Sequence, residues 1–385
     1  MRAIAILLAL PALAALGQGS EFDQELEAGK RLFDAGKYAE AEPHFARARM
    51  AEPKRWQGHT WHAFALIQLA YAEPADSKRR EDLLHEVRAL TGPLVKQCGL
   101  DFSDPLRHYL LGLVEHGAGE VDASFKHFAK ARASGGEALD RYREIRLDEQ
   151  IARAYGRAAK VLGERLLQKG KFKQAHPILR DALAALEGVS ATQADVAGLH
   201  RALALTSEKL GQSDQTLQHL EALLVIDGQD PMRRDYLLAA IATIHLRAGK
   251  LERGRDALGK IPDEVSLPRV IEARCLAKKV AALQAPGTDA LRDALAAYDE
   301  ALRSHPEQAQ LQLAADYAEL ALAQAERGPV EKAVERLVLE VERHPAEPLS
   351  YLWLQRCHLR LGNEKEAARC AQLHEQKQRA RSSAD

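Results

Sequence analysis

Residues 29–53 read GKRLFDAGKYAEAEPHFARARMAEP, and this stretch decides the fold. Gly36 separates two amphipathic segments and is typical of a helix C-terminal stop. Ala41 follows the glycine by five residues and Phe45 by nine, which places a small and a bulky side chain on one face of the second helix. Gly29, seven residues before the turn, is a matching notch on the first helix. The stretch therefore predicts an antiparallel pair of closely packed helices.

The same pattern recurs along the chain. Each further turn glycine is followed by a small side chain and, except in the last copy, by a bulky apolar one at the same spacings. The last two turn glycines are 34 residues apart (362 minus 328), and two earlier ones are 38 apart (249 minus 211). Self-similarity of this kind indicates a solenoid of stacked helix pairs. The turn glycines are Gly36, Gly119, Gly170, Gly211, Gly249, Gly328 and Gly362.

The composition favours helices throughout. Hydrophobic residues make up 46%, aromatic residues 5% and charged residues 28% of the 385 residues, a mixture typical of amphipathic helices. The strict alternation that marks half-buried strands is missing from every stretch longer than a few residues. We therefore expect an all-α fold with essentially no sheet.

The period and the motif resemble the tetratricopeptide repeat, a helix pair of 34 residues. The resemblance implies an all-α, right-handed α-α superhelical solenoid of tetratricopeptide-like helix pairs. It also implies that the first helix of each pair lines a concave surface that binds extended peptides or partner helices. The first copy carries the resemblance in Gly29, Leu32, Gly36, Tyr38, Ala41, Phe45, Ala48 and Pro53, and another copy carries it in Tyr317, Leu320, Ala321, Gly328, Ala333, Leu337 and Pro345.

The repeats predict one continuous array. We expect residues 18–380 to hold about eight or nine helix pairs, followed by a tail at residues 381–385. Residues 56–103 and 263–310 are helical in pattern but lack the turn glycine, so we interpret them as degenerate repeats.

The first 17 residues are typical of a secretory signal peptide. Arg2 is a minimal basic region, an apolar stretch follows, and small residues end it at Gly17. The stretch is shorter than the roughly 20 residues that cross a bilayer, and no second one follows, which favours a cleaved signal peptide over the alternative, an uncleaved anchor. We expect an exported mature chain that starts near Gln18, has no transmembrane segment, and is periplasmic or extracellular.

The four cysteines are too few and too scattered to form a disulfide framework. Cys357 and Cys370 fall on consecutive predicted helices that pack together. They form either one bridge in an oxidising compartment or two buried thiols.

Charge and motifs exclude several classes of function. The formal net charge is -1, so there is no excess of basic residues for phosphates, and we expect no nucleic-acid partner. The sequence lacks the phosphate-binding loop, the dinucleotide turn, the nucleophile elbow and the zinc-protease helix, so we expect no enzyme, no catalytic residue and no cofactor. His59 and His62 share a helical face and could hold a metal, but Trp56 and Trp61 beside them favour a packed aromatic cluster.

We interpret the chain as an extracytoplasmic protein-binding scaffold whose partner is a protein or peptide of unknown identity. A carbohydrate or cell-wall binding module is the alternative, and it would need exposed Trp and Tyr side chains in the groove. Arg and Tyr are the favoured anchors for a protein partner. Placed by the resemblance on the concave face, the candidate partner-binding residues are Lys30, Tyr109, His116, Lys160, Glu164, Arg201, Tyr236, Arg247, Arg356 and Arg360.

Overall fold

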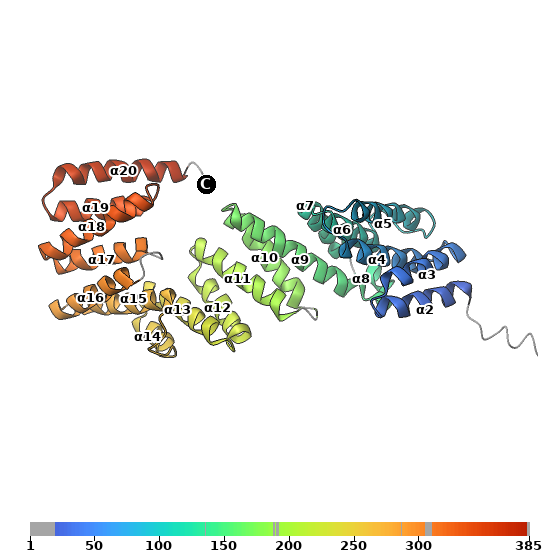
Figure 1. Cartoon of the computed structure of the whole chain (residues 1–385), viewed down its shortest axis with the longest axis horizontal. Coiled ribbons are helices and arrows are strands. Elements are labelled where there is room, and N and C mark those ends of the chain that lie inside the picture. Colours follow the sequence, from blue (N-terminus) through green and yellow to red (C-terminus); the bar gives the residue numbers. More distant parts are fainter. Residues whose placement is uncertain are drawn as a thin grey trace, which may run out of the picture. The chain divides into compact units, whose positions relative to one another are not determined.

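The computed structural model describes residues 20–134, 136–187, 189, 192–285, 287–304 and 310–382. Over these residues the chain consists of helices and connecting turns, with no strand. Consecutive helices pack as antiparallel pairs along the chain (Figure 1). The predicted fold class, an all-α solenoid of tetratricopeptide-like helix pairs, is confirmed.

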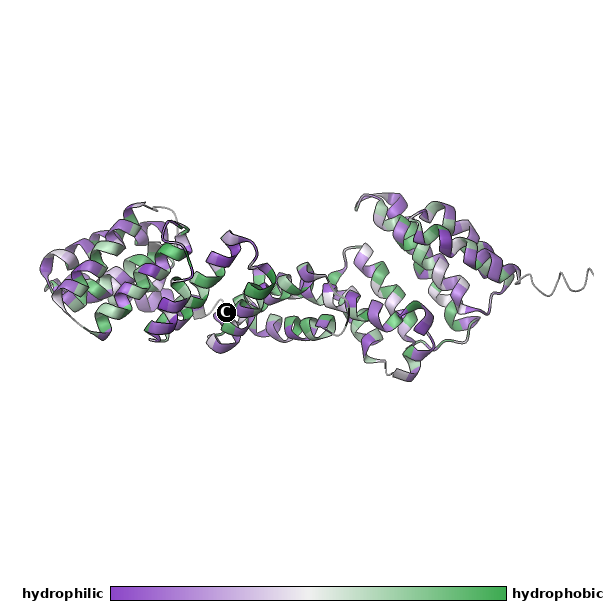
Figure 2. Ribbon diagram, turned by 90° about the horizontal axis from the view of Figure 1, so that it is seen from below, coloured by the Kyte–Doolittle hydropathy of each residue, from purple (hydrophilic) through white to green (hydrophobic). Residues whose placement is uncertain are grey.

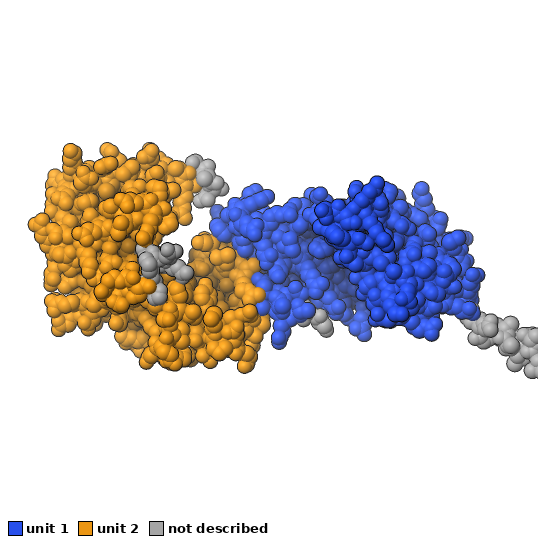
Figure 3. Space-filling model, viewed as in Figure 1, with its two compact units in different colours: residues 1–199 blue, residues 200–385 orange. Residues whose placement is uncertain are grey.

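The chain divides into two compact units, Met1–Leu199 and His200–Asp385 (Figure 3). Unit 1 contains the pairs α2 (Glu21–Asp34) with α3 (Tyr38–Ala51), α4 (Trp56–Ala72) with α5 (Lys78–Lys96), α6 (Pro105–Gly117) with α7 (Val121–Ala133), and α9 (Leu147–Gln168) with α10 (Phe172–Glu187). The division falls within α11 (Gln193–Lys209).

Unit 2 continues with α12 (Ser213–Asp227) and then with four further helix pairs. These are α13 (Pro231–Arg247) with α14 (Leu251–Leu258), α15 (Pro268–Gln284) with α16 (Thr288–Ser304), α17 (Gln310–Gln324) with α18 (Arg327–Arg343), and α19 (Pro348–Arg360) with α20 (Glu364–Ser382). Residues 56–103 and 263–310, which lack the turn glycine, thus contain the pairs α4–α5 and α15–α16.

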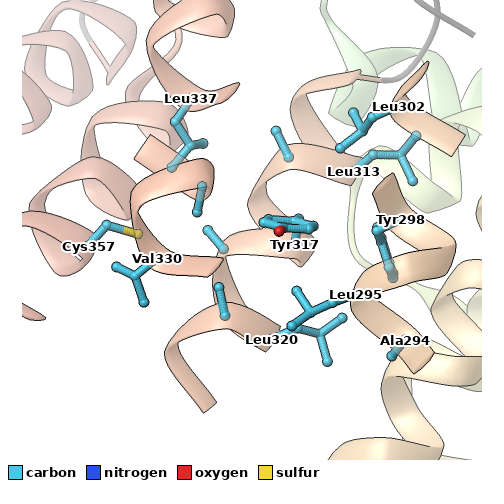
Figure 4. Close-up of a cluster of buried hydrophobic side chains, with 14 of the residues drawn as sticks. Ala294, Leu295, Tyr298, Leu302, Leu313, Tyr317, Leu320, Val330, Leu337 and Cys357 are labelled. Atoms are coloured by element: carbon cyan, nitrogen blue, oxygen red, sulfur yellow. The ribbon is translucent and has the colours of Figure 1, made fainter. Parts of the chain in front are cut away.

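Hydrophilic and hydrophobic residues alternate along the helices (Figure 2), as expected where one face of each helix packs on its neighbours. The core of unit 2 illustrates the result. Leu295 and Tyr298 of α16 meet Leu313 and Tyr317 of α17 in one buried cluster (Figure 4).

A buried polar network lies beside this cluster. The Lys279 Nζ of α15 donates to the Asp316 Oδ1 of α17 over 2.8 Å, and the Tyr298 hydroxyl donates to Asp316 Oδ2 over 3.1 Å. Lys279 is 8% exposed and Asp316 is also 8% exposed, so each charge depends on these partners.

The predicted notch receives the predicted bulky residue. A Cβ built on Gly29 would lie 2.5 Å from the Phe45 ring, and one built on Gly112 would lie 2.5 Å from the Phe128 ring. Both aromatic side chains are buried. The glycines are therefore required by the close approach of the two helices in α2–α3 and in α6–α7.

Six of the seven predicted turn glycines have a φ between +71° and +80°. Gly328 is the exception, and its prediction as a helix stop was wrong. The left-handed residue of that turn is Ala325, with φ +61°, and α18 begins two residues later at Arg327, so that Gly328 lies inside the helix. The turn has moved three residues toward the N-terminus and is made by a residue with a Cβ.

A short insertion follows α7 in unit 1. It contains α8 (Gly136–Asp140) and the 3-10 helix η1 (Arg143–Ile145). Tyr142 is fully buried between them, packs edge-on against Trp56 with ring centroids 4.9 Å apart, and donates its hydroxyl to Asp104 over 2.8 Å. The insertion thus ties the start of α4 to the start of α6.

The predicted signal peptide at residues 1–17 and the last three residues of the predicted tail lie outside the described residues. The array was expected to end at residue 380, whereas α20 continues to Ser382. Among the described residues, no helix combines the length and apolar character needed to cross a bilayer. Of the two states considered for Cys357 and Cys370, the structure has two buried free thiols.

Candidate functional site

A pocket of about 720 Å³ opens on unit 2 between α11, α12 and α13 and reaches the start of α15. This volume lies within the range of about 300–1,000 Å³ of ligand pockets. We call it the α11–α13 pocket. Its lining residues are Arg201, Ala204, Leu205, Glu208, Thr216, Leu220, Leu223, Asp227, Met232, Arg233, Tyr236, Leu237, Ala240, Ile244, Leu267 and Arg269.

The floor and the walls of this pocket are apolar. Leu223 of α12 and Leu237 of α13 are buried in the floor. Above them Leu205 is 44% exposed, Tyr236 is 53% exposed and Met232 is 67% exposed. Large apolar side chains gathered at one exposed site mark interaction surfaces, whereas such residues scattered singly do not.

One end of the pocket carries arginine side chains held by a partly buried carboxylate. Arg201 of α11 contacts Asp227 over 2.9 Å, and Arg233 of α13 contacts the same carboxylate over 3.5 Å. The Asp227 side chain is 14% exposed, but those of Arg201 and Arg233 are 53% and 59% exposed. Asp227 therefore anchors two guanidinium groups that are both more than half exposed, and the Arg233 Nε also lies 3.4 Å from Asp230.

A third arginine lines the pocket from the first turn of α15. Arg269 lies 4.0 Å from Glu272, and its buried Nε has no hydrogen-bond partner among the described residues. Burial raises the pKa of Glu272, against the opposing effect of Arg269 and Arg247. At 4.0 Å, the contact between Arg269 and Glu272 is an ion pair without a close hydrogen bond.

The opposite end of the pocket is acidic. Glu208 lies seven residues after Arg201 on α11, which corresponds to about 10 Å along a helix. Ile244 lies eleven residues after Arg233 on α13, about 16 Å along its axis. Asp227 contacts both Arg201 and Arg233, so these two arginines lie at the same end of the pocket. From this end α11 runs toward Glu208 and α13 runs toward Ile244.

The connection before α15 is fixed by one side chain. The Arg274 guanidinium donates to the carbonyl oxygens of Pro262, Asp263 and Val265 over 2.8 to 3.0 Å. These bonds replace the backbone pairing that a regular element would provide. Leu267, which follows this connection, lines the pocket beside Arg269.

The structure brings together two of the predicted partner-binding residues, Arg201 and Tyr236, in the α11–α13 pocket. Arg247 is exposed at the last position of the same α13. On α19, the Arg356 guanidinium lies 4.7 Å from the Trp353 ring centroid, and Arg360 donates to the Ala325 carbonyl over 2.9 Å. Arg360 therefore helps to terminate α17.

The predicted residues of unit 1 are spread over three helices, α2, α6 and α9. Lys30 of α2 pairs with Glu27 over 3.1 Å and lies over the Trp61 ring. His116 of α6 packs against Tyr71. Lys160 and Glu164 of α9 lie 4.0 Å apart as an i,i+4 pair.

Tyr109 requires a correction. It was placed on an exposed face, but its side chain is 7% exposed, and its hydroxyl donates to Gln150 of α9 over 3.0 Å. Burial raises its pKa. The neighbouring pair packs over this position, so Tyr109 belongs to the core of unit 1 and is not available to a partner.

The pocket residues that sequence reasoning missed include Leu205, Met232, Arg233 and Arg269. Leu205 follows Arg201 by one helical turn, and Met232 precedes Tyr236 by one, so each lies on the same helical face as a predicted anchor. A large apolar residue on an otherwise polar face was the available signal.

His59 and His62 are buried. The His59 Nε2 contacts the Pro53 carbonyl over 2.9 Å and the His62 Nε2 contacts Glu42 over 2.7 Å. No group of three or more His, Cys, Asp or Glu side chains that could hold a metal occurs in the part of the chain that the structure describes. Trp61 stacks on Phe45 with ring centroids 5.7 Å apart.

No protein-family model and no curated protein matches this chain. Among solved structures, it is similar to the P58(IPK) tetratricopeptide domain at 16% identity, with 93% of each chain covered and a TM-score of 0.30. A Rap protein complexed with competence and sporulation factor is 13% identical, with 95% of this chain and 99% of that chain covered and a TM-score of 0.41. A tetratricopeptide repeat protein from Parabacteroides merdae is 14% identical, with 80% and 100% covered and a TM-score of 0.33. The helix pairs described above, rather than these distant likenesses, define the chain as an all-α array of tetratricopeptide-like repeats.

Proposed function

We propose that this protein is a binding scaffold that captures a short peptide segment of a protein partner in the α11–α13 pocket. The single observation behind the proposal is the convergence of Leu205, Met232 and Tyr236 over an apolar floor. Aromatic and Met side chains are enriched at the centres of protein interfaces, and a pocket with a charged rim excludes water around them.

A peptide segment fits this site better than a sugar. Stacking on sugars requires exposed aromatic faces, and Tyr236 is the aromatic residue in the pocket lining. The Trp56 side chain is buried, and Trp61 and Trp353 are half-buried outside the pocket. The apolar walls instead suit aliphatic side chains of a partner.

Selection from a random peptide library, followed by measurement of the dissociation constants of the selected peptides, tests the proposal. We expect Leu205→Asp to weaken binding of selected peptides by about tenfold or more, because a carboxylate replaces apolar contact area. Leu359→Asp is the matched control, since Leu359 is 56% exposed on α19 and lies outside the pocket. Peptides that bind both variants as they bind the original chain would place the binding surface elsewhere.

We further propose that the scaffold is exported and acts outside the cytoplasm. Arg2, the apolar stretch that follows and the small residues ending at Gly17 support this proposal. Mass spectrometry of the protein from fractionated cells tests it. We expect an N-terminus near Gln18 in the extracytoplasmic fraction, and an intact Met1 in the cytoplasmic fraction would contradict export.

A further inference from the structure

The two ends of the α11–α13 pocket differ, because Arg201 and Arg233 lie at one end and Glu208 lies at the other. Resting on the function proposed above, we propose that its occupant is an acidic–apolar segment. One or two Asp or Glu side chains bind at the arginine end, and the large apolar residues that follow cover Leu205 and Tyr236.

The arginine end has unused hydrogen-bonding capacity. A guanidinium carries five N–H donors, and a bound carboxylate typically takes two of them side by side. Arg201 and Arg233 share the carboxylate of Asp227, Arg233 also contacts Asp230, and more than half of each arginine side chain is exposed. A ligand carboxylate can therefore add to these groups without the removal of an existing partner.

The acidic neighbours limit the charge of the ligand. Asp227 faces Arg201, Asp230 lies 3.4 Å from Arg233, and Glu272 lies 4.0 Å from Arg269. These carboxylates offset much of the positive charge, so the site offers directed donors rather than a strong positive field. Singly charged carboxylates suit such a site better than doubly charged phosphates.

The spread of the arginines favours acidic side chains over a single chain terminus. Arg201, Arg233 and Arg269 come from three different helices, α11, α13 and α15. Carboxylates on successive residues of one segment can reach donors on different helices. The distance of about 10 Å from Arg201 to Glu208 along α11 corresponds to about three extended residues, and the 16 Å along α13 to about five.

Fluorescence anisotropy with synthetic probes tests the inference on the full chain. The acidic probe is a labelled peptide Glu-Glu-Leu-Phe-Leu-Leu with both ends capped, and the basic probe has Lys-Lys in place of Glu-Glu. A third probe, Leu-Phe-Leu-Leu with a free C-terminal carboxylate, measures the contribution of a chain end. We expect the acidic probe to bind at least about tenfold more tightly than either of the others.

The charge-reversed variant Arg201→Glu with Arg233→Glu should lose this preference and favour the basic probe. The matched control is Arg303→Glu with Arg327→Glu, which reverses two exposed arginines of unit 2 outside the pocket and should leave the preference unchanged. Circular dichroism spectra of both variants show whether the helices are intact.

The possible failures are distinguishable. If all probes bind equally and Leu205→Asp weakens them all, the acidic preference is overturned while the proposed peptide-binding function stands. If the terminal-carboxylate probe binds most tightly, the ligand group is a chain end and the inference is wrong. If no probe binds and library selection also yields nothing sensitive to Leu205→Asp, both the inference and the proposed function at this pocket fail.

Discussion

Ala325 adopts the left-handed conformation that glycine adopts at the other repeat turns. A Cβ in this conformation approaches the following carbonyl oxygen and costs roughly 1–2 kcal/mol. The main-chain oxygen of Ala325 accepts a hydrogen bond from Arg360, and a change of side chain leaves that bond in place.

We therefore expect Ala325→Gly to raise the free energy of unfolding by about 0.5–1 kcal/mol, after the extra entropy of glycine in the unfolded chain is subtracted. Urea denaturation followed by circular dichroism measures the difference. Gly36→Ala is the control with the opposite substitution, because it places a Cβ at a φ of +73°, and it should lower the free energy of unfolding. A loss of stability in Ala325→Gly would show that this turn is not strained.

The packing of Gly112 against Phe128 supports a second prediction. The added methyl group of Gly112→Ala would lie 2.5 Å from the Phe128 ring, so either the ring or the α6 backbone must shift. We expect the free energy of unfolding to fall by about 1–3 kcal/mol, despite the better helix propensity of alanine. The double variant with Phe128→Leu should recover part of the loss in the same denaturation assay, and additive losses would contradict the close-packing account.

The spacing of residues predicted this packing well. Small and bulky side chains at fixed sequence spacings from a turn glycine indicate which residues pack together, because the spacing between two residues on a helix determines whether they share a face. The turn at Ala325 escaped prediction because alanine seldom adopts a positive φ, so the residue gave no local signal of a turn. Tyr109 escaped because burial at that position depends on the neighbouring α9, to which Gln150 belongs.

At the scale of helices, a pair of histidines joins α6 and α7. The Nδ1 atoms of His108 and His127 lie 3.1 Å apart, so at least one of them must lack a proton. Burial, together with His127, Lys130 and Arg107, lowers the pKa of His108 from its ordinary value near 6.5 to about 4. Burial also lowers the pKa of His127, with Glu115 opposing.

These shifts predict an acid-sensitive helix pair. Between about pH 6.5 and pH 4 the unfolded chain binds more protons at these sites than the folded chain does, so the folded state loses stability as the pH falls. Thermal unfolding at pH 7.5, 6.0 and 5.0 measures this loss. We expect His108→Gln with His127→Gln to show a smaller decrease in Tm over this range, and an unchanged decrease would assign the acid sensitivity to other groups.

The insertion containing α8 and η1 was not predictable from periodicity, because a five-residue helix is too short to display a repeat of 3.6 residues. Only the burial of Tyr142 shows what the segment does. In the α11–α13 pocket, the sequence indicated Arg201 and Tyr236 through the repeat frame. It could not indicate Arg269, whose place in the pocket depends on how the connection held by Arg274 brings α15 to α13.

At the scale of the whole molecule, most packing is between consecutive helices. A destabilising substitution should therefore affect mainly the helices next to it. In repeat arrays, stability is approximately a sum of repeat terms and nearest-neighbour terms, so strain in one unit need not loosen the other. Gly112→Ala in unit 1 should therefore speed amide hydrogen exchange in α6 and α7 but leave exchange in α17 and α18 unchanged. Hydrogen exchange resolved by peptide mass spectrometry measures both; faster exchange in all four helices would mean that the chain unfolds as one cooperative body.

Tyr142 stands apart from this nearest-neighbour rule, because its ring packs on Trp56, 86 residues earlier in the chain (142 minus 56). Synthesis proceeds from the N-terminus, so α4 leaves the ribosome well before Tyr142 does. Until then one side of the Trp56 ring has no cover, and Asp104 has no phenol to bind. The packing at the start of α4 and at the start of α6 is therefore completed only once residue 142 has emerged from the ribosome.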